Sequence, residues 1–212
     1  RRADRPLFAV ALDDDEAPAG LAGGRFAGLR EVVAEVSADA AALLAYARAM
    51  VIWQQRHRYC GTCGAPAAPR DGGFVMACTA HEEHRSFPRL DPAVIVLVHR
   101  GEQCLLGRQG AWPEGRFSTV AGFVEETNVR VGALRYLGSQ PWPFPAALMI
   151  GYHAAATGGE LCFNDGELIE ARWCTRAEVR AGVVRLPPRA SIAFQLIAAW
   201  CDEAPGPRLA SL

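Results

Sequence analysis

Aliphatic runs separated by charged and glycine-rich turns occupy the second half of the chain, and this pattern predicts a β-sheet. Residues 93–98 (AVIVLV) are an uninterrupted aliphatic run, which is typical of a strand buried on both faces. A turn at Arg100 and Gly101 precedes residues 103–106, which we expect to form the return strand of a hairpin. Further strands are predicted over residues 117–122, 129–137, 148–155 and 170–174.

Two helices are predicted in the C-terminal part of the chain. Thr175 and Glu178 have the spacing of a capping box, which starts a brief helix. A second helix is expected from about residue 189 to about residue 203, with Ile192, Leu196 and Ala199 on one face. Strands followed by helices in this order predict an α+β fold, in which a mixed sheet carries helices on its faces.

The first 57 residues predict a separate N-terminal α/β unit. Residues 7–12 are a strand candidate, residues 13–24 an acidic, Gly/Pro-rich loop, and residues 26–36 a short apolar segment. Ser37 is the expected N-cap of a helix that continues to about His57. The predicted buried face of this helix repeats at helical spacing and comprises Ala40, Leu43, Leu44, Ala47 and Val51. We expect this unit to be structural and to form an interface.

Composition narrows the classes of function. The chain has 212 residues, of which 50% are hydrophobic and 21% charged, as in ordinary globular proteins with one large or two modest domains. A net charge of -1 argues against a surface built mainly to neutralise phosphate backbones. All 22 basic residues are arginine, which excludes a Walker-type phosphate loop and Schiff-base chemistry because both require lysine.

Compartment is inferred from two features. No apolar run reaches the roughly 18 residues that span a bilayer, and acidic residues stand where a signal peptide would be cleaved. The seven cysteines are an odd number without the spacing of a secreted disulfide framework. We therefore expect a cytoplasmic protein that contains one metal-binding cysteine pair and several buried thiols.

Residues 58–89 predict a small zinc-ribbon segment. Cys60 and Cys63 are separated by two residues, the spacing that lets one tight turn point both thiolates at one tetrahedral Zn²⁺. Cys78 is the expected third ligand and His81 the fourth, with His84 as the alternative. If no zinc is bound, Cys78 is a plain buried thiol and both histidines are solvated. We favour a structural zinc over a catalytic or nucleic-acid-binding one, because no general base or run of interleaved basic and aromatic residues accompanies it.

Five segments together resemble the NADH pyrophosphatase branch of the Nudix hydrolases: FPRLDPAVIVLV, CLLGRQ, FSTVAGFVE, SQPWPFPAALMIGY and NDGELIEARW. The most specific is SQPWPFP. The resemblance implies a Nudix-type α/β/α sandwich over residues 90–204, followed by a tail at 205–212. It also implies a homodimeric enzyme that hydrolyses NADH or NAD⁺ to nicotinamide mononucleotide and AMP, and family members also remove NAD caps from RNA. Related pyrophosphatases carry a zinc ribbon with four cysteines at the position of residues 58–89.

The resemblance also implies a catalytic metal site. Cleavage of a pyrophosphate requires Mg²⁺ or Mn²⁺ held by carboxylates, which offsets phosphoryl charge and activates water. Glu125 and Glu126 align with glutamates of the family motif, and Glu167 aligns with a downstream glutamate, with Glu170 as a second candidate. Without a metal, these residues are simply solvated turn and loop charges.

The Nudix motif of this chain is short. Gly122 to Glu125 match its opening and Glu126 to Val129 its close, so roughly fourteen positions of the metal-binding helix are absent between them. Either the helix is lost, or the molecule contains residues that the sequence omits. We favour omission, because loss of the helix would unravel the fold between Val124 and Val129, where the chain would have to span one face of the sheet without it. Two further hypotheses stay open: a Nudix-fold protein that binds dinucleotides without turnover, and a zinc-ribbon interaction module.

The segment SQPWPFP is interpreted as a ligand platform. Its prolines stiffen the backbone, so that Trp142 can stack on a nicotinamide or adenine ring with little ordering cost. The resemblance places Gln140 and Trp142 near the nicotinamide, and Phe87, Phe123 and Ala193 around the other base. Each aromatic residue taken alone can instead be a core residue, above all Phe87 and Phe144, and Trp142 is the one for which we favour ligand contact.

Overall fold

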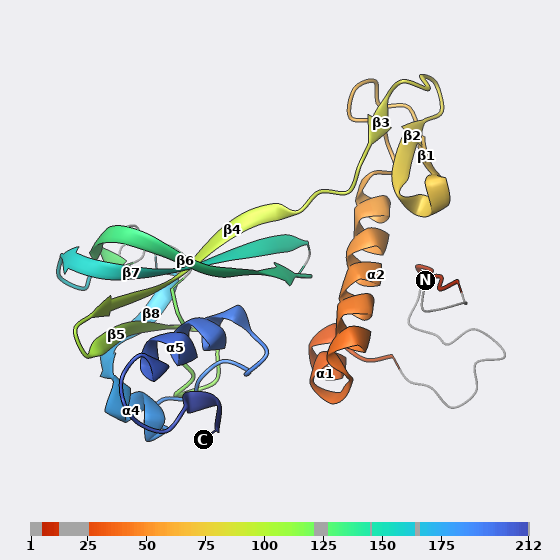
Figure 1. Cartoon of the computed structure of the whole chain (residues 1–212). Coiled ribbons are helices and arrows are strands. Elements are labelled where there is room, and N and C mark those ends of the chain that lie inside the picture. Colours follow the sequence, from red (N-terminus) through yellow and green to blue (C-terminus); the bar gives the residue numbers. More distant parts are fainter. Residues whose placement is uncertain (1–5, 13–25, 121–126, 145, 164–165, 212) are drawn as a thin grey trace. The chain divides into compact units, whose positions relative to one another are not determined.

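The fold is a computed structural model of the 212-residue chain (Figure 1). It describes all residues except 1–5, 13–25, 121–126, 145, 164–165 and 212. The chain separates into two compact units: one contains Arg1–Leu90 and Trp142–Ala147, the other Asp91–Pro141 and Leu148–Leu212. Each unit is described by itself.

Two helices begin the first unit. The apolar segment after residue 26 forms α1 (Leu29–Glu35), and α2 spans Ala38–Arg56. Ser37 caps α2 as predicted, since its side chain accepts a hydrogen bond from the backbone N–H of Ala40 at 3.3 Å. The predicted apolar face of α2 is only partly buried, because Leu43 and Leu44 are each 40% exposed. The strand predicted over residues 7–12 is wrong: these residues are exposed and have no strand partner in the described chain.

A three-stranded antiparallel sheet completes the first unit. Its strands are β1 (Ala67–Arg70), β2 (Val75–Cys78) and β3 (Arg85–Ser86), in the order β1-β2-β3. The turn η1 (Asp71–Gly73) joins β1 to β2. Gln54 of α2 donates a hydrogen bond to the carbonyl oxygen of Gly73 at 2.8 Å, which fastens the helix to this small sheet.

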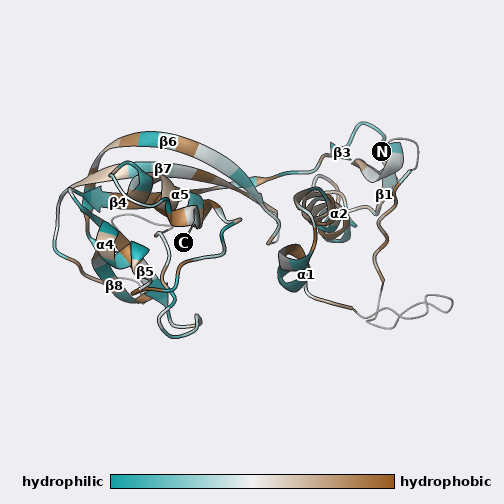
Figure 2. Cartoon of the chain, turned by 60° about the horizontal axis from the view of Figure 1, so that its bottom comes forward, coloured by the Kyte–Doolittle hydropathy of each residue, from teal (hydrophilic) through white to brown (hydrophobic). Residues whose placement is uncertain are grey.

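The second unit is built on a five-stranded sheet in the order β6-β7-β4-β5-β8. The strands are β4 (Asp91–Arg100), β5 (Gln103–Gln109), β6 (Arg130–Trp142), β7 (Ala147–Gly158) and β8 (Leu168–Thr175). β5 pairs antiparallel with both β4 and β8. Along β6, hydrophilic and hydrophobic positions both occur, as expected of an edge strand with one exposed side (Figure 2). In the predicted strand over 117–122, the described residues make isolated bridges only.

Helices α4 (Arg176–Arg180) and α5 (Ile192–Asp202) lie on one face of this sheet (Figure 1). The predicted capping box at Thr175 and Glu178 is present. α5 begins later than predicted because Ser191 caps it. Its buried residues pack with sheet residues in one core, which includes Leu97, Leu106, Leu196, Ile197 and Trp200. Within the described chain no helix is both long and apolar enough to cross a membrane.

A smaller core covers the opposite face of the sheet. Its buried members are Val96, Val98, Leu105, Val129 and Ala154. Thr127 and Val129, which directly follow the short Nudix motif, are 2% and 1% exposed. The residues that carry the opening of the motif, together with Glu126, lie outside the described residues.

Candidate zinc ribbon and dinucleotide site

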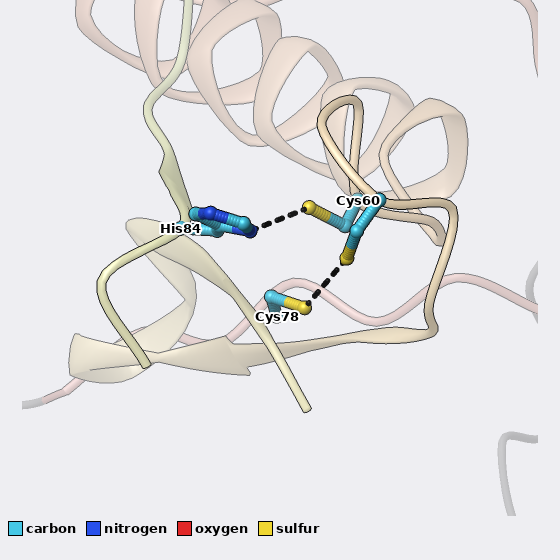
Figure 3. A group of neighbouring side chains, drawn as sticks. Cys60, Cys78 and His84 are labelled. Atoms are coloured by element: carbon cyan, nitrogen blue, oxygen red, sulfur yellow. Dashed lines mark hydrogen bonds between the residues drawn. The ribbon is translucent and has the colours of Figure 1, made fainter. Parts of the chain in front are cut away.

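Three cysteines and one histidine converge at the end of the small sheet (Figure 3). The ligand atoms of Cys60, Cys63, Cys78 and His84 all lie within 4.8 Å of one another. The tight turn that begins at Cys60 is closed by a hydrogen bond from the N–H of Gly64 to the carbonyl oxygen of Cys60 at 2.9 Å. The chain thus brings together one thiolate pair from this turn and one thiol from β2.

The fourth member of the cluster is His84 and not the expected His81. β3 pairs with β2, and the N–H of Cys78 donates to the carbonyl oxygen of His84 at 3.0 Å, so the pairing carries His84 beside Cys78. His81 lies in the turn that precedes His84, with its side chain 50% exposed and 3.9 Å from Glu83. The spacing Cys-x-x-His suggested a second knuckle, but hairpin pairing decides which histidine faces the thiols.

The distances in this cluster fit a tetrahedral zinc. With metal bonds of about 2.3 Å to sulfur and about 2.0 Å to nitrogen, tetrahedral ligands stand about 3.8 Å (S to S) and about 3.5 Å (S to N) apart. The Cys63 and Cys78 sulfurs are 3.5 Å apart, and Cys60 Sγ is 3.6 Å from His84 Nδ1. Backbone N–H groups of Cys63 and Thr62 lower the pKa of Cys60 to about 6, which favours the thiolate that binds metal.

The remaining core cysteines are buried thiols, as predicted. Cys104, Cys174 and Cys201 have no exposed surface, and all three are free. Burial raises the pKa of Cys104 and of Cys174, and raises that of Cys201 to about 11. These thiols are therefore protonated packing groups at neutral pH.

Only some of the predicted catalytic carboxylates belong to the described residues. Glu125 and Glu126 lie outside the described residues. Glu167 is exposed and accepts a hydrogen bond from Gln109 Nε2 at 2.6 Å, while Glu170 pairs with Arg108 at 3.3 Å. Among the described residues the cysteine and histidine cluster is the one group that fits a metal, and no set of three carboxylates does. Glu167 and Glu170 alone therefore do not fit Mg²⁺ or Mn²⁺.

The Pro and aromatic segment is held by arginines of the first two helices. Arg48 of α2 donates a hydrogen bond to the carbonyl oxygen of Pro143, and the guanidinium of Arg30 lies 4.5 Å from the ring centre of Phe144. The rings of Trp142 and Phe144 meet edge to face at 5.1 Å. Both arginines were missed from the sequence, because they stand far from this segment and belong to no local motif.

The other predicted ligand residues have different environments. Phe87 is 58% exposed, so it is not the core residue that was the alternative interpretation, whereas Ala193 is 6% exposed and part of the core of the second unit. Phe123 lies outside the described residues. Gln140 is half-buried, and both ends of its amide are bonded to the segment that starts α5.

Comparisons with known proteins match the N-terminal part of the chain to two family models. One is described as an NADH pyrophosphatase-like rudimentary NUDIX domain and matches residues 1–53. The other is described as an NADH pyrophosphatase zinc ribbon domain and matches residues 55–87. The second match includes all four members of the cysteine and histidine cluster.

Similar proteins extend across most of the chain. "NAD-capped RNA hydrolase NudC" of Stutzerimonas stutzeri is 39% identical over 207 residues, covering 91% of this chain and 72% of that protein. The protein of the same name from Mycobacterium bovis is 41% identical over 204 residues, covering 82% of this chain but 63% of its own length. The alignment with the Stutzerimonas protein is 207 positions long, whereas 91% of this 212-residue chain is about 193 residues. The alignment therefore includes positions at which this chain has no residue.

One solved structure is also similar to part of this chain. The crystal structure of a NUDIX hydrolase from Nitrosomonas europaea covers 69% of this chain and 91% of its own, with a TM-score of 0.48 and 20% identity.

Proposed function

The chain belongs to the Nudix hydrolases of the NADH pyrophosphatase branch, and from this membership we propose that it hydrolyses the pyrophosphate bond of NADH or NAD⁺. The products are nicotinamide mononucleotide and AMP. NAD-capped RNA, which carries the same bond at its 5′ end, is the second substrate that we propose, because the relatives bear the name NAD-capped RNA hydrolase. The observation that carries the proposal is the 39% identity to a relative of which this chain covers 72%.

The chain's own residues support recognition of a dinucleotide. Trp142 is half-buried against Phe144, so one part of its ring is fixed while the rest remains free to stack on a planar base. Arg48 fixes the backbone between these two rings by its bond to Pro143. Stiff aromatic groups bind a ring with little loss of side-chain entropy, which suits the nicotinamide or adenine of NADH.

Of the three carboxylates that we assign to catalysis, only Glu167 belongs to the described residues. We propose that Glu125, Glu126 and Glu167 are the carboxylates of the reaction and that Mg²⁺ or Mn²⁺ is required. A bound divalent cation would offset phosphoryl charge and lower the pKa of the attacking water. Glu167 directly precedes β8, and its carboxylate accepts a hydrogen bond from Gln109 of β5.

A second candidate function is binding of NADH without turnover. One observation favours it: the motif lacks its Arg-Glu pair between Glu125 and Glu126.

The two candidates are separated by product analysis. Purified protein is incubated with NADH and millimolar Mn²⁺, and the products are resolved by chromatography and mass spectrometry. Equal amounts of nicotinamide mononucleotide and AMP are expected, with the same cleavage at the 5′ end of NAD-capped RNA. NADH that binds but stays intact would reject the hydrolase and support the binding protein.

We also propose an oligomeric state and a cellular compartment. We expect a homodimer with the N-terminal helices at the contact, and light scattering coupled to gel filtration measures its mass directly. We also expect the protein in the cytoplasm, where NAD-capped RNA and reduced thiols are available.

A further inference from the structure

Helix α2 (Ala38–Arg56) is fastened to the small sheet of the zinc ribbon at two levels (Figure 1). Its Gln54 donates a hydrogen bond to the carbonyl oxygen of Gly73 at 2.8 Å. About two turns earlier along the helix, the ring of Tyr46 lies 6.4 Å from the ring of Phe74. The helix and the small sheet therefore support each other along about two turns of α2.

The first unit has a very small core. Among its described residues, the buried side chains are Trp53 of α2 and the four residues of β2 (Val75–Cys78). Leu43 and Leu44 of the same helix stay 40% exposed. A helix of this length and a sheet of such short strands are marginally stable in water when so little apolar surface is buried. The unit therefore needs a further source of stability.

The four candidate zinc ligands would tie the ends of the small sheet together. Cys60 and Cys63 lie between α2 and β1, Cys78 is the last residue of β2, and His84 directly precedes β3. One zinc ion on these four residues would hold all three strands, a few residues beyond the end of α2 at Arg56. Small zinc domains commonly unfold without their metal. Loss of zinc should therefore release the sheet and the contacts that the sheet makes with α2.

The same helix holds the Pro and aromatic segment. Trp142–Ala147 belongs to the same compact unit as α2. Arg48 of α2 donates a hydrogen bond to the carbonyl oxygen of Pro143, and its guanidinium lies 5.5 Å from the ring centre of Phe144. Arg30 of α1 lies 4.5 Å from the same ring centre. The contacts of Arg48 require α2 to be helical, because the helix determines where Arg48 stands.

We propose that zinc binding at the ribbon orders the Pro and aromatic segment through α2, with Arg48 as the residue that transmits the effect. Zinc stabilises the small sheet, the sheet stabilises α2, and α2 places Arg48 against the carbonyl oxygen of Pro143. Loss of zinc should therefore loosen Trp142–Ala147, a segment that contains none of the four candidate zinc ligands. The coupling does not rest on the proposed function, because all its contacts lie within the first unit and exist without a substrate.

Hydrogen exchange of the full-length protein, measured by NMR without any nucleotide, tests this coupling. The N–H of Phe144 donates to the carbonyl oxygen of Trp142 at 2.9 Å, so its exchange reports the order of the segment. Removal of zinc with a chelator should speed exchange in the C-terminal half of α2. It should also speed exchange at Phe144 at least about tenfold, the fold-change of one hydrogen bond to a charged group. Amides of β5, which pairs with β4 and β8 in the second unit, should be unchanged.

A variant of Arg48 tests the path. In the zinc-bound protein, Arg48→Met should speed exchange at Phe144 at least about tenfold, because the charged hydrogen bond to Pro143 is lost. The chelator should then have little further effect at Phe144, while α2 still responds to it. Arg56→Met changes an exposed arginine at the end of the same helix and is the matched control, which should behave like wild type.

Four results would overturn the proposal. The first is unchanged exchange at Phe144 while α2 loosens, and the second is a chelator response at Phe144 in Arg48→Met as large as in wild type. Faster exchange in β5 as well would show unfolding of the whole chain instead of a specific coupling. Unchanged exchange in α2 would show that zinc does not support the helix. All four are read without NADH, so they are distinct from failure of the proposed function.

Discussion

Replacement of His84 by alanine tests the zinc cluster most sharply, because His81 provides a matched control three positions away. His84 Nδ1 is 3.6 Å from Cys60 Sγ, a distance that one zinc ion bridges, whereas the His81 ring is half exposed outside the cluster. Zinc binding contributes about 10–16 kcal/mol in small zinc domains, or about 2.5–4 kcal/mol for each of four ligands. His84→Ala should therefore weaken zinc binding by about two to three powers of ten, and His81→Ala by less than about threefold.

Zinc affinity is measured by competition with a chromogenic chelator at constant pH, with elemental analysis for stoichiometry. Wild type and His81→Ala should hold one zinc per chain, and His84→Ala should release it at much lower chelator concentration. Equal losses in both variants, or loss in His81→Ala alone, would refute the assignment of His84.

Three further predictions concern ligand, catalysis and pH. Trp142→Ala should raise the Kd for NADH by at least about fivefold, since base stacking contributes about 1–3 kcal/mol, and a fluorescence titration with unchanged Kd would contradict a stacking role. Glu167→Gln should lower kcat on the order of a hundredfold with little change in Kd, as measured by product formation, because it removes one charged group from the reaction; unchanged kcat would exclude it from catalysis. His153 is buried, and its pKa is lowered from 6.5, chiefly by this burial. As the pH drops below 6.5, the unfolded chain therefore takes up a proton that the folded chain does not bind. The free energy of unfolding should fall over this range and stop falling once the pH is below the pKa of His153 in the folded protein. Denaturant titrations should show this loss in wild type and a flatter profile in His153→Gln; parallel profiles would contradict it.

The environment of His153 explains this pH dependence. Its Nδ1 accepts from Arg135 at 2.9 Å and its Nε2 donates to the carbonyl oxygen of Leu196 at 2.9 Å, so the neutral ring satisfies both partners. Protonation would place a second N–H against the guanidinium of Arg135. Burial, the largest cause, lowers the pKa of His153, and Arg135 and His99 act in the same direction; together they outweigh the carbonyl of Leu196 and Glu203, which favour the charged ring.

Local sequence chemistry predicted those elements whose signals lie within a few residues. The helix capped by Ser37, the capping box at Thr175 and the aliphatic strand at 93–98 all occur in the structure. Each is stabilised by groups that are neighbours in sequence, or by an apolar run that has no stable exposed state. Periodicity was less reliable for α2, since Leu43 and Leu44 stay 40% exposed although they share the predicted buried face.

Features that depend on distant partners were not predictable in the same way. The choice of His84 over His81 follows from the pairing of β2 with β3, which the Cys-x-x-His spacing does not contain. The bonds of Gln140 to Ala190 and Ile192 join residues about fifty positions apart, so no local motif announces them. The ligand contact that the family resemblance implies for Gln140 stays a prediction.

Turnover of NADH by a protein of known intact mass tests the proposed function most directly. The mass is compared with 22.8 kDa, and the same sample is incubated with NADH and Mn²⁺ while nicotinamide mononucleotide and AMP are quantified. We predict both products in equal amounts, with cleavage abolished by a chelator of divalent cations and strongly reduced in Glu167→Gln. A protein of 22.8 kDa that binds NADH and releases neither product would contradict the hydrolase and identify the chain as a dinucleotide-binding member of its family.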